Sequence, residues 1–258
     1  MDGLILSSPA RVLFSVNGFE VYIYGLTMAL AIFCGVFISN YFANISGKFS
    51  KDIFLNVAPL VIICGLLGAR LWYCGINYEF YIQNPAAMLN FREGGISIHG
   101  AIFGGAIALW YFARKNKFKW QSLFDYAVLG LALGQSIGRW GNFFNNEAFG
   151  LPSDAWLKLY IPLQNRPEVF LNYEYFHPTF LYESVLDFVL FLLLCRLLGK
   201  FPDGKLTLLY LIAYSVIRFF LEFLRIDSTL NFGIITFPAL VSLLVFIVSI
   251  FVLIKLYK

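Results

Sequence analysis

Seven long apolar segments, separated by shorter polar ones, dominate the hydropathy pattern of the chain. Each is close to the roughly 20 residues that a helix needs to cross a bilayer. The pattern therefore predicts an all-α polytopic membrane protein with seven transmembrane helices. The predicted helices are Val21–Ala43, Ile53–Ile76, Ile96–Ala113, Leu123–Arg139, Pro178–Leu198, Leu206–Leu224 and Ile234–Leu256.

The polar segments between the predicted helices leave no room for a separate soluble domain. Residues 1–258 are therefore predicted to form a single membrane-embedded domain. The two longest connecting segments, near residues 77–95 and 141–177, are rich in Asn, Pro and Tyr. We expect both of these segments to pack at the membrane interface.

The distribution of basic residues predicts how the helices are oriented. The loops after the first, third and fifth helices, together with the C-terminus, hold eleven Lys and Arg residues, whereas the opposite side holds five. Cytoplasmic loops carry the excess of basic residues in membrane proteins. The N-terminus is therefore predicted to lie outside and the C-terminus in the cytoplasm.

The composition agrees with this reading and narrows the function. The chain is 60% hydrophobic and 13% charged, whereas a soluble domain carries roughly 25% charged residues. The basic residues are scattered apart from one short loop, so nucleic-acid binding is not indicated. With two histidines and no carboxylates at ligand spacing, no metal site is predicted.

Polar side chains gather at the predicted outer ends of six helices, which predicts a site at the level of the outer leaflet. Ionisable residues inside a membrane are costly to bury, so they suggest function. These residues are Tyr24, Arg70, Tyr73, His99, Arg139, Asn142, Glu147, His177, Tyr182, Glu183, Arg218, Glu222 and Arg225.

The segment from Gly138 to Gly150 is the most unusual of these polar stretches. Turn-forming Asn and Gly residues are explained by a capped helix end. Capping does not explain Arg139 at the membrane boundary, so we favour a functional role.

Arg218, Glu222 and Arg225 are spaced to share one helix face, and one carboxylate cannot neutralise two arginines. This spacing indicates that an arginine here meets an external anion.

The glycine spacing is explained by helix packing alone, whereas the role of His99 stays open. Gly130, Gly134 and Gly138 recur every four residues, which favours close helix packing, and Gly100 and Gly104 are expected to act similarly. His99 follows a glycine-flanked helix start. From the residues alone, it could be a general base or a structural hydrogen-bonding residue.

Arginines at the depth of the outer leaflet suit a lipid phosphate, because guanidinium binds phosphate with two parallel hydrogen bonds. A lipid-modifying enzyme fits this chemistry, and so does a transporter of an anionic lipid or solute. The apolar inner halves of several predicted helices disfavour the transporter. A purely structural subunit would leave Arg70, Arg139 and Arg218 without a purpose.

The pattern Gly138-Arg-x-Gly-Asn-Phe-x-Asn-x-Glu147-x-x-Gly150 resembles the hallmark of bacterial prolipoprotein diacylglyceryl transferases. Further motifs of that family occur in order along nearly the whole chain: Tyr24-Gly25-Leu26, Gly68-Ala-Arg70-x-x-Tyr73, Gly94-Gly95-x-Ser97-x-His99-Gly100, Asp125, His177-Pro178-x-x-Leu181-Tyr182-Glu183 and Arg218-x-x-x-Glu222-x-x-Arg225.

The chain departs from the family pattern at two places. Ala101-Ile102 follows His99-Gly100 where the family usually has Gly-Leu, and Phe180 stands where the family usually has Gln. The first is a change of one methyl group in a helix and should be tolerated. The second removes a polar side chain, so residue 180 offers no side-chain hydrogen bond to the site.

The resemblance implies an enzyme of the bacterial plasma (inner) membrane that acts without a cofactor. Its substrates would be phosphatidylglycerol, a membrane lipid, and prolipoprotein signal peptides with a lipobox cysteine. It would transfer the diacylglyceryl group to the cysteine sulfhydryl, the first step of lipoprotein maturation. The implied residues are Arg139 and Arg218 on the phosphate, Glu147 and Glu222 holding the arginines, His99 as candidate base, Tyr24 and Asn142 positioning the headgroup, and Arg70 and Gly150 in the lipid site.

Overall fold

The protein is mostly helical and falls into two compact units. The computed structural model describes residues 3–9, 11–16, 19–90, 94–226, 231–232 and 235–257. One unit combines Met1–Gly35 with Val128–Lys258, and we call it the terminal unit. The other, Val36–Ala127, is the central unit. The divisions fall inside two long helices, so both units share these helices.

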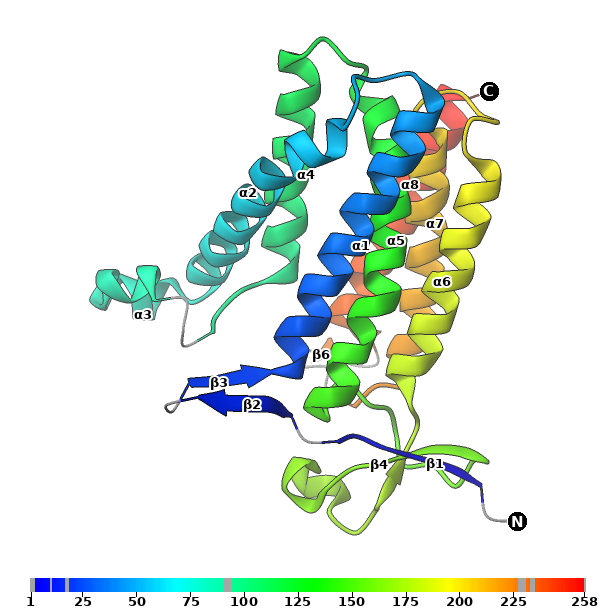
Figure 1. The fold of residues 1–258 in the computed structure, drawn as a ribbon. Helices are drawn as coiled ribbons and strands as arrows, with labels where there is room; N and C mark the ends of the chain where they lie inside the picture. Colours follow the sequence, from blue (N-terminus) through cyan, green and yellow to red (C-terminus); the bar gives the residue numbers. More distant parts are fainter. Residues whose placement is uncertain are drawn as a thin grey trace. The chain divides into compact units, whose positions relative to one another are not determined.

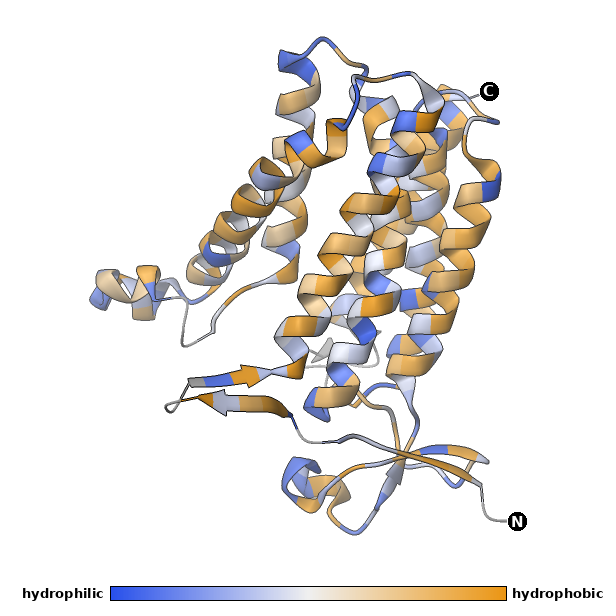
Figure 2. Cartoon of the chain, viewed as in Figure 1, coloured by the Kyte–Doolittle hydropathy of each residue, from blue (hydrophilic) through white to orange (hydrophobic). Residues whose placement is uncertain are grey.

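Each of the seven predicted helices has a counterpart in the structure, and hydrophobic residues predominate along these helices (Figures 1 and 2). By length and composition, α1, α2 and α8 could each cross a membrane. The long helices are α1 (Ile23–Ser46), α2 (Ile53–Ile76), α4 (Ile98–Lys115), α5 (Trp120–Asn145), α6 (Thr179–Leu197), α7 (Lys205–Glu222) and α8 (Phe237–Leu256).

The largest difference from the predicted helices concerns the end of α5. We predicted that this helix ends at Arg139, whereas it continues to Asn145. Asparagine is tolerated in a helix, and the chain leaves the helical conformation only where Asn146 and Ala148 adopt left-handed backbone angles, with φ of 53° and 56°. Arg139 and Asn142 therefore project from a helix rather than from a loop after it.

Shorter elements lie in the segments between the long helices. Segment 77–95 contains α3 (Tyr78–Gln83) and the 3₁₀ turn η1 (Pro85–Leu89), and segment 141–177 contains the turns η2 (Leu163–Asn165) and η3 (Glu168–Phe170). The strands are β1 (Leu4–Ser7), β2 (Val12–Val16), β3 (Phe19–Tyr22), β4 (Leu157–Tyr160), β5 (Tyr175–Phe176), β6 (Asn231–Phe232) and β7 (Ile235–Thr236).

The strands form three small sheets. The strand β4 pairs with β1 in parallel and with β5 in antiparallel orientation, whereas β2–β3 and β6–β7 are antiparallel pairs. The first sheet covers a small core of Phe149, Leu159, Ile161, Phe176 and Phe180. These strands have two to five residues, which is too short for alternation to reveal them in the sequence.

Glycines allow close helix packing within each unit, as the four-residue spacing predicted. In the terminal unit, a Cβ atom on Gly35 of α1 would lie 2.7 Å from the carbonyl oxygen of Gly130 on α5. In the central unit, a Cβ atom on Gly100 of α4 would overlap the carbonyl oxygen of Gly68 on α2. A larger side chain at these positions would force the helices apart.

The connection from α1 to α2 is held by one aspartate. The carboxylate of Asp52 accepts hydrogen bonds from the side-chain amides of Asn40 (3.0 Å) and Asn44 (2.9 Å). The backbone N–H of Asp52 in turn donates to the side-chain oxygen of Asn44 (2.9 Å). Because both amides donate to the charged form, they hold the pKa of Asp52 below its ordinary value.

We expect the replacement Asp52→Ala to lower the thermal stability of the detergent-solubilised protein at pH 7. The folded-state pKa of Asp52 is lowered, so its contribution is present above the unfolded-state pKa of about 3.9. This contribution is lost as the pH falls through the folded-state value. The difference in Tm between the wild type and the variant should therefore shrink on acidification below pH 4. A difference that stays constant from pH 7 to pH 3 would contradict this account.

Candidate active site

Three helices of the terminal unit bring an arginine, a glutamate and a second arginine together. Arg139 comes from α5, Glu183 from the first turns of α6, and Arg218 from α7. Nη2 of Arg139 lies 2.7 Å from Oε1 of Glu183, and Nη1 of Arg218 lies 3.6 Å from Oε2 of the same carboxylate. Glu183 therefore joins all three helices at one point.

Arg225 and Glu222 complete this arginine–glutamate cluster. Nη1 of Arg225, just after α7, lies 3.9 Å from Oε2 of Glu183. Nη2 of Arg218 lies 2.7 Å from Oε2 of Glu222, which follows it by four residues on α7. The hydroxyl of Thr236, which caps the start of α8, donates to Oε1 of Glu222 (3.0 Å). The cluster is thus tied to a fourth helix.

The cluster contains three guanidinium groups and two carboxylates, so it carries a positive excess. Glu183 is almost fully buried, with 1% of its side chain exposed, whereas the arginine side chains are 11–22% exposed. Within the residues that the structure describes, Nη1 of Arg218 is buried and has no hydrogen-bond partner. A buried donor without a partner is costly. A ligand oxygen could remove that cost.

Polar side chains and reciprocal hydrogen bonds hold α5, α6 and α7 in register. The hydroxyl of Tyr214 on α7 accepts from Nη2 of Arg139 (3.4 Å), and Tyr210, one turn away, donates to Gln135 of α5 (2.8 Å). On the facing sides of α5 and α6, Ser136 and Ser184 each donate to the carbonyl oxygen of the other (2.8 Å for both). The arginine–glutamate cluster therefore rests on a rigid support.

Asp187 lies one turn after Glu183 on α6 and is fully buried. Its two carboxyl oxygens accept no hydrogen bond from any residue in the described ranges. Burial of a carboxyl group without hydrogen-bond partners is costly.

The terminal unit also contains Tyr24, Asn142 and Glu147, three of the residues predicted for the site. Tyr24, at the start of α1, packs against Gly141 of α5, where an added Cβ would lie 2.9 Å from its ring. The amide of Asn142 donates to Oε1 of the exposed Glu147 (3.0 Å). The structure therefore pairs Glu147 with Asn142, whereas Glu222 contacts an arginine as expected.

Gly150 lies at a junction of three backbone segments. Its N–H donates to the carbonyl oxygen of His177 (2.9 Å), and it forms a β-bridge with Arg225. An added Cβ would lie 2.8 Å from both His177 and the carbonyl oxygen of Leu224. This close approach requires glycine and fixes the backbone next to Arg225.

Phe180, which stands where the resembled family usually has Gln, is an aromatic core residue. It is buried and stacks on Phe143 with 4.8 Å between ring centroids. It also meets the edge of Trp140 at 5.5 Å. The aromatic ring thus supports the end of α5 beside the cluster by packing alone.

The central unit holds the two remaining residues of the predicted site, His99 and Arg70. His99 lies in the first turn of α4, half-buried, and stacks on Trp72 of α2 with 6.4 Å between ring centroids. The guanidinium of Arg70, near the end of α2, donates to backbone carbonyl groups of the segment before α4.

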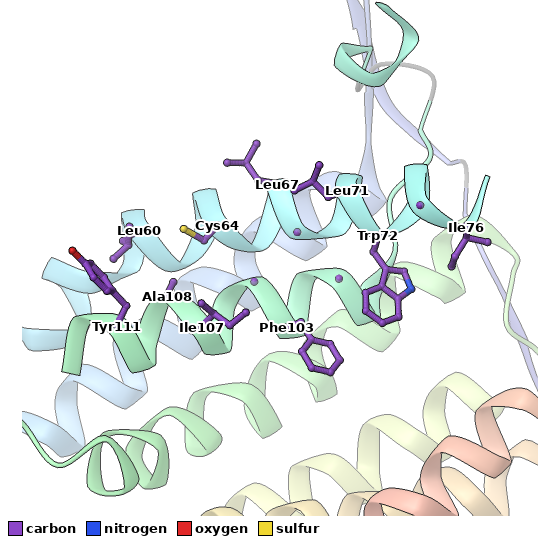
Figure 3. Close-up of a pocket in the computed structure, with 14 residues that line it drawn as sticks. Leu60, Cys64, Leu67, Leu71, Trp72, Ile76, Phe103, Ile107, Ala108 and Tyr111 are labelled. Carbon is purple, nitrogen blue, oxygen red and sulfur yellow. The ribbon is translucent and has the colours of Figure 1, made fainter. Parts of the chain in front are cut away.

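An apolar groove of about 740 Å³ runs along α2 and α4 in the central unit (Figure 3). Gly68 and Gly104 form part of its floor, and Trp72, Phe103 and Tyr111 contribute aromatic walls. Trp72 also stacks on Phe103, with 5.5 Å between centroids and 9° between the rings. The tryptophan that contacts His99 is therefore one of the residues that line the groove.

Glu183 is the central residue of the cluster; the sequence placed it among the polar residues at the outer helix ends, but the predicted catalytic and lipid-binding residues did not include it. The available signal was a carboxylate near the start of an otherwise apolar helix, six residues after His177. A buried acid in such a helix implies a buried cation. The sequence could not show that three arginines from different positions reach the same acid.

These features define a helical membrane protein with a buried cationic cluster. The family model for prolipoprotein diacylglyceryl transferase matches residues 11–255. The phosphatidylglycerol–prolipoprotein diacylglyceryl transferase of Synechococcus sp. (strain CC9902) is 41% identical over 231 residues, covering 87% of this chain and 82% of that protein. The protein of the same name from Nostoc sp. is 39% identical over 246 residues, covering 93% and 86%.

The chain therefore belongs to the prolipoprotein diacylglyceryl transferase family, as its motifs indicated. The match covers both compact units, because it extends over almost the whole length of the chain. The cluster, the junction at Gly150 and the start of α4 are all inside the matched residues.

We expect Glu183→Ala to destabilise the folded protein by about 3–5 kcal/mol, because it leaves buried guanidinium groups without their shared counter-ion. Thermal unfolding in detergent, followed by intrinsic fluorescence, would measure the change. Glu174→Ala removes an exposed carboxylate of the same unit and should change stability by no more than about 0.5 kcal/mol. Equal Tm values for the two variants would show that Glu183 does not hold the cluster together.

Proposed function

We propose that this protein transfers the diacylglyceryl group of phosphatidylglycerol to the sulfhydryl of the lipobox cysteine in prolipoprotein signal peptides. Two lines of support converge on this proposal. The relatives bear the name of this reaction, and the terminal unit contains a cationic cluster suited to a phosphodiester.

The observation that carries the proposal is the unused hydrogen-bonding capacity of the two predicted phosphate-binding arginines. Each guanidinium has five N–H donors. Arg139 uses Nη2 for Glu183 and Tyr214, while Nη1 of Arg218 is buried without a hydrogen-bond partner among the described residues. The acids hold both side chains in place and leave donors for phosphate oxygens. This arrangement supports assigning the lipid phosphate to Arg139 and Arg218.

The reaction exchanges a carbon–oxygen bond for a carbon–sulfur bond. The cysteine sulfur attacks the diacylglyceryl carbon, and glycerol 1-phosphate leaves with the electron pair of the broken bond. Cations placed in advance stabilise the charge that gathers on the leaving phosphate. A free thiol has a pKa of about 8.5, so its proton needs an acceptor. We assign that role to His99, and the positioning of the headgroup to Tyr24 and Asn142.

We further propose that the protein forms a single membrane-embedded domain with seven spans, its N-terminus outside and its C-terminus in the cytoplasm of a bacterium. The excess of Lys and Arg in alternate loops supports this orientation. Under it, the arginine–glutamate cluster faces the outer leaflet of the inner membrane, and segments 77–95 and 141–177 lie at its periplasmic surface.

We expect Arg139→Ala and Arg218→Ala each to lower the rate of transfer about 10²- to 10³-fold, as removal of one electrostatic stabiliser of a transition state does. Arg139→Lys should also be impaired, because Lys cannot donate two parallel hydrogen bonds. Purified protein in detergent, radiolabelled phosphatidylglycerol and a synthetic lipobox peptide provide the assay. The label should move to the peptide and should not move when its cysteine is replaced by serine.

Arg196→Ala is the matched control for these variants, because Arg196 is an exposed arginine near the other end of α6. It should leave the transfer rate within about twofold, since surface substitutions have small effects. An Arg139→Ala variant with full activity would contradict the assignment of the lipid phosphate to Arg139. Lipid flipping in proteoliposomes without any labelled peptide would instead favour a lipid transporter.

The proposed orientation predicts opposite labelling of two loops. In a chain whose native cysteines are replaced, Asp154→Cys should react with a membrane-impermeant maleimide in intact spheroplasts. Asn116→Cys, which lies in the basic loop after α4, should react only after permeabilisation. Equal reactivity of both positions in intact spheroplasts would contradict an odd number of spans between them.

A further inference from the structure

Arg70 makes a dense set of hydrogen bonds within the central unit. Its Nε donates to the carbonyl oxygen of Met88 (2.9 Å), and its Nη2 to those of Ala87 (2.6 Å) and Asn90 (2.8 Å). Its Nη1 donates to the carbonyl oxygens of Gly94 (2.6 Å) and Gly95 (2.8 Å). Five backbone acceptors thus match the five N–H donors of a guanidinium.

This arrangement differs from that of a phosphate-binding arginine. Arg70 is only 5% exposed, and its guanidinium lies 5.4 Å from the ring centroid of Tyr81, which covers it. A phosphate could reach it only by displacing carbonyl groups that are already bound. Arg139 is more exposed and retains donors that are not used in this way.

The absence of a side chain at Gly95 permits its close contact with the guanidinium of Arg70. Its φ is +76°, in the left-handed region that favours glycine. A Cβ atom there would lie 2.6 Å from Nη1 of Arg70 and 2.8 Å from the ring of Tyr73. The backbone at Gly95 therefore approaches the guanidinium as closely as it does because it has no side chain.

The bonds to Arg70 begin a series of contacts that leads to His99. Next along the chain, the N–H of Ser97 donates to the carbonyl oxygen of Ala69, beside Arg70 on α2 (3.0 Å). The ring of His99 then stacks on Trp72, two residues after Arg70 (6.4 Å between centroids). Residues 94–99 are thus attached to the last two turns of α2 at three successive points, and the last of them is Trp72, which also lines the apolar groove (Figure 3).

We propose that Arg70 is a positioning residue, which fixes residues 87–90, residues 94–95 and the start of α4 so that His99 is held in place, and is not a ligand of the lipid phosphate. This inference rests on the proposed function insofar as His99 takes the thiol proton. Its structural part, the fixing of His99 by Arg70, can be measured without catalysis. A shift of about 1 Å in a positioned group can cost about 10²-fold in rate.

The proposal predicts that Arg70→Ala lowers kcat about 10²-fold and leaves binding of phosphatidylglycerol in the absence of peptide within about threefold of the wild type. Arg70→Lys should recover only part of the activity, because an ammonium group has three donors instead of five. Arg139→Ala is the comparison, since it should weaken lipid binding directly. Binding by Arg70→Ala as weak as that of Arg139→Ala would overturn the proposal.

Gly95→Ala tests the same contact with the arginine intact, in case Arg70→Ala fails to fold. It should reproduce the loss of kcat, because its Cβ meets the guanidinium. Gly75→Ala is the matched control, since an added Cβ on this α2 residue meets nothing within 4 Å. It should retain wild-type activity.

The chemical reactivity of His99 gives a readout that does not depend on transfer. The chain has two histidines, so mass spectrometry can follow diethylpyrocarbonate modification of each. Arg70→Ala and Gly95→Ala should raise the modification rate of His99 several-fold and leave that of His177 in the terminal unit unchanged. An unchanged rate at His99 would overturn the proposal. Failure of the wild type to transfer label would overturn only the proposed function.

Discussion

The buried carboxylate of Glu183 is the contact on which the terminal unit depends. Three guanidinium groups lie within 4 Å of it, and burial of such charges is costly unless they are paired. One acid on α6 therefore makes it possible for α5 and α7 to carry arginines among apolar helices. The reciprocal Ser136 and Ser184 bonds and the tie from Glu222 to Thr236 hold this arrangement in one geometry.

The two units accommodate buried arginines in different ways. In the terminal unit, carboxylates neutralise part of the charge of Arg139 and Arg218, so some guanidinium donors remain for another anion. In the central unit, backbone carbonyl groups use all five donors of Arg70. In our proposals the same residue type therefore binds an anion in the terminal unit and orders the backbone in the central unit. The two arrangements differ in the partners of the arginines and also in exposure, since Arg70 is more deeply buried than Arg139.

The chain belongs to the prolipoprotein diacylglyceryl transferase family, and the proposed reaction explains why some arginines keep donors for an anion. In the proposed reaction the substrate brings the nucleophile, and the enzyme supplies cations for a leaving phosphate and an acceptor for one proton. Pre-organised charges are effective only when they do not relax toward each other. The paired acids around Arg139 and Arg218, and the aromatic support from Phe180, provide that rigidity.

The long helices could be read from the sequence because apolar runs of 18 or more residues have few alternatives; α2 begins and ends at the predicted residues. Motif order was likewise sufficient to indicate the family.

The end of α5, the short strands and the role of Glu183 required the tertiary structure. Asparagines permit both helix and turn, so only packing decides where α5 ends. Likewise, an acid on α6 can meet arginines from α5, α7 and the segment after α7 only when the helices assemble. The backbone hydrogen bonds of Arg70 also depend on tertiary structure, since its carbonyl partners lie 17 to 25 residues further along the chain.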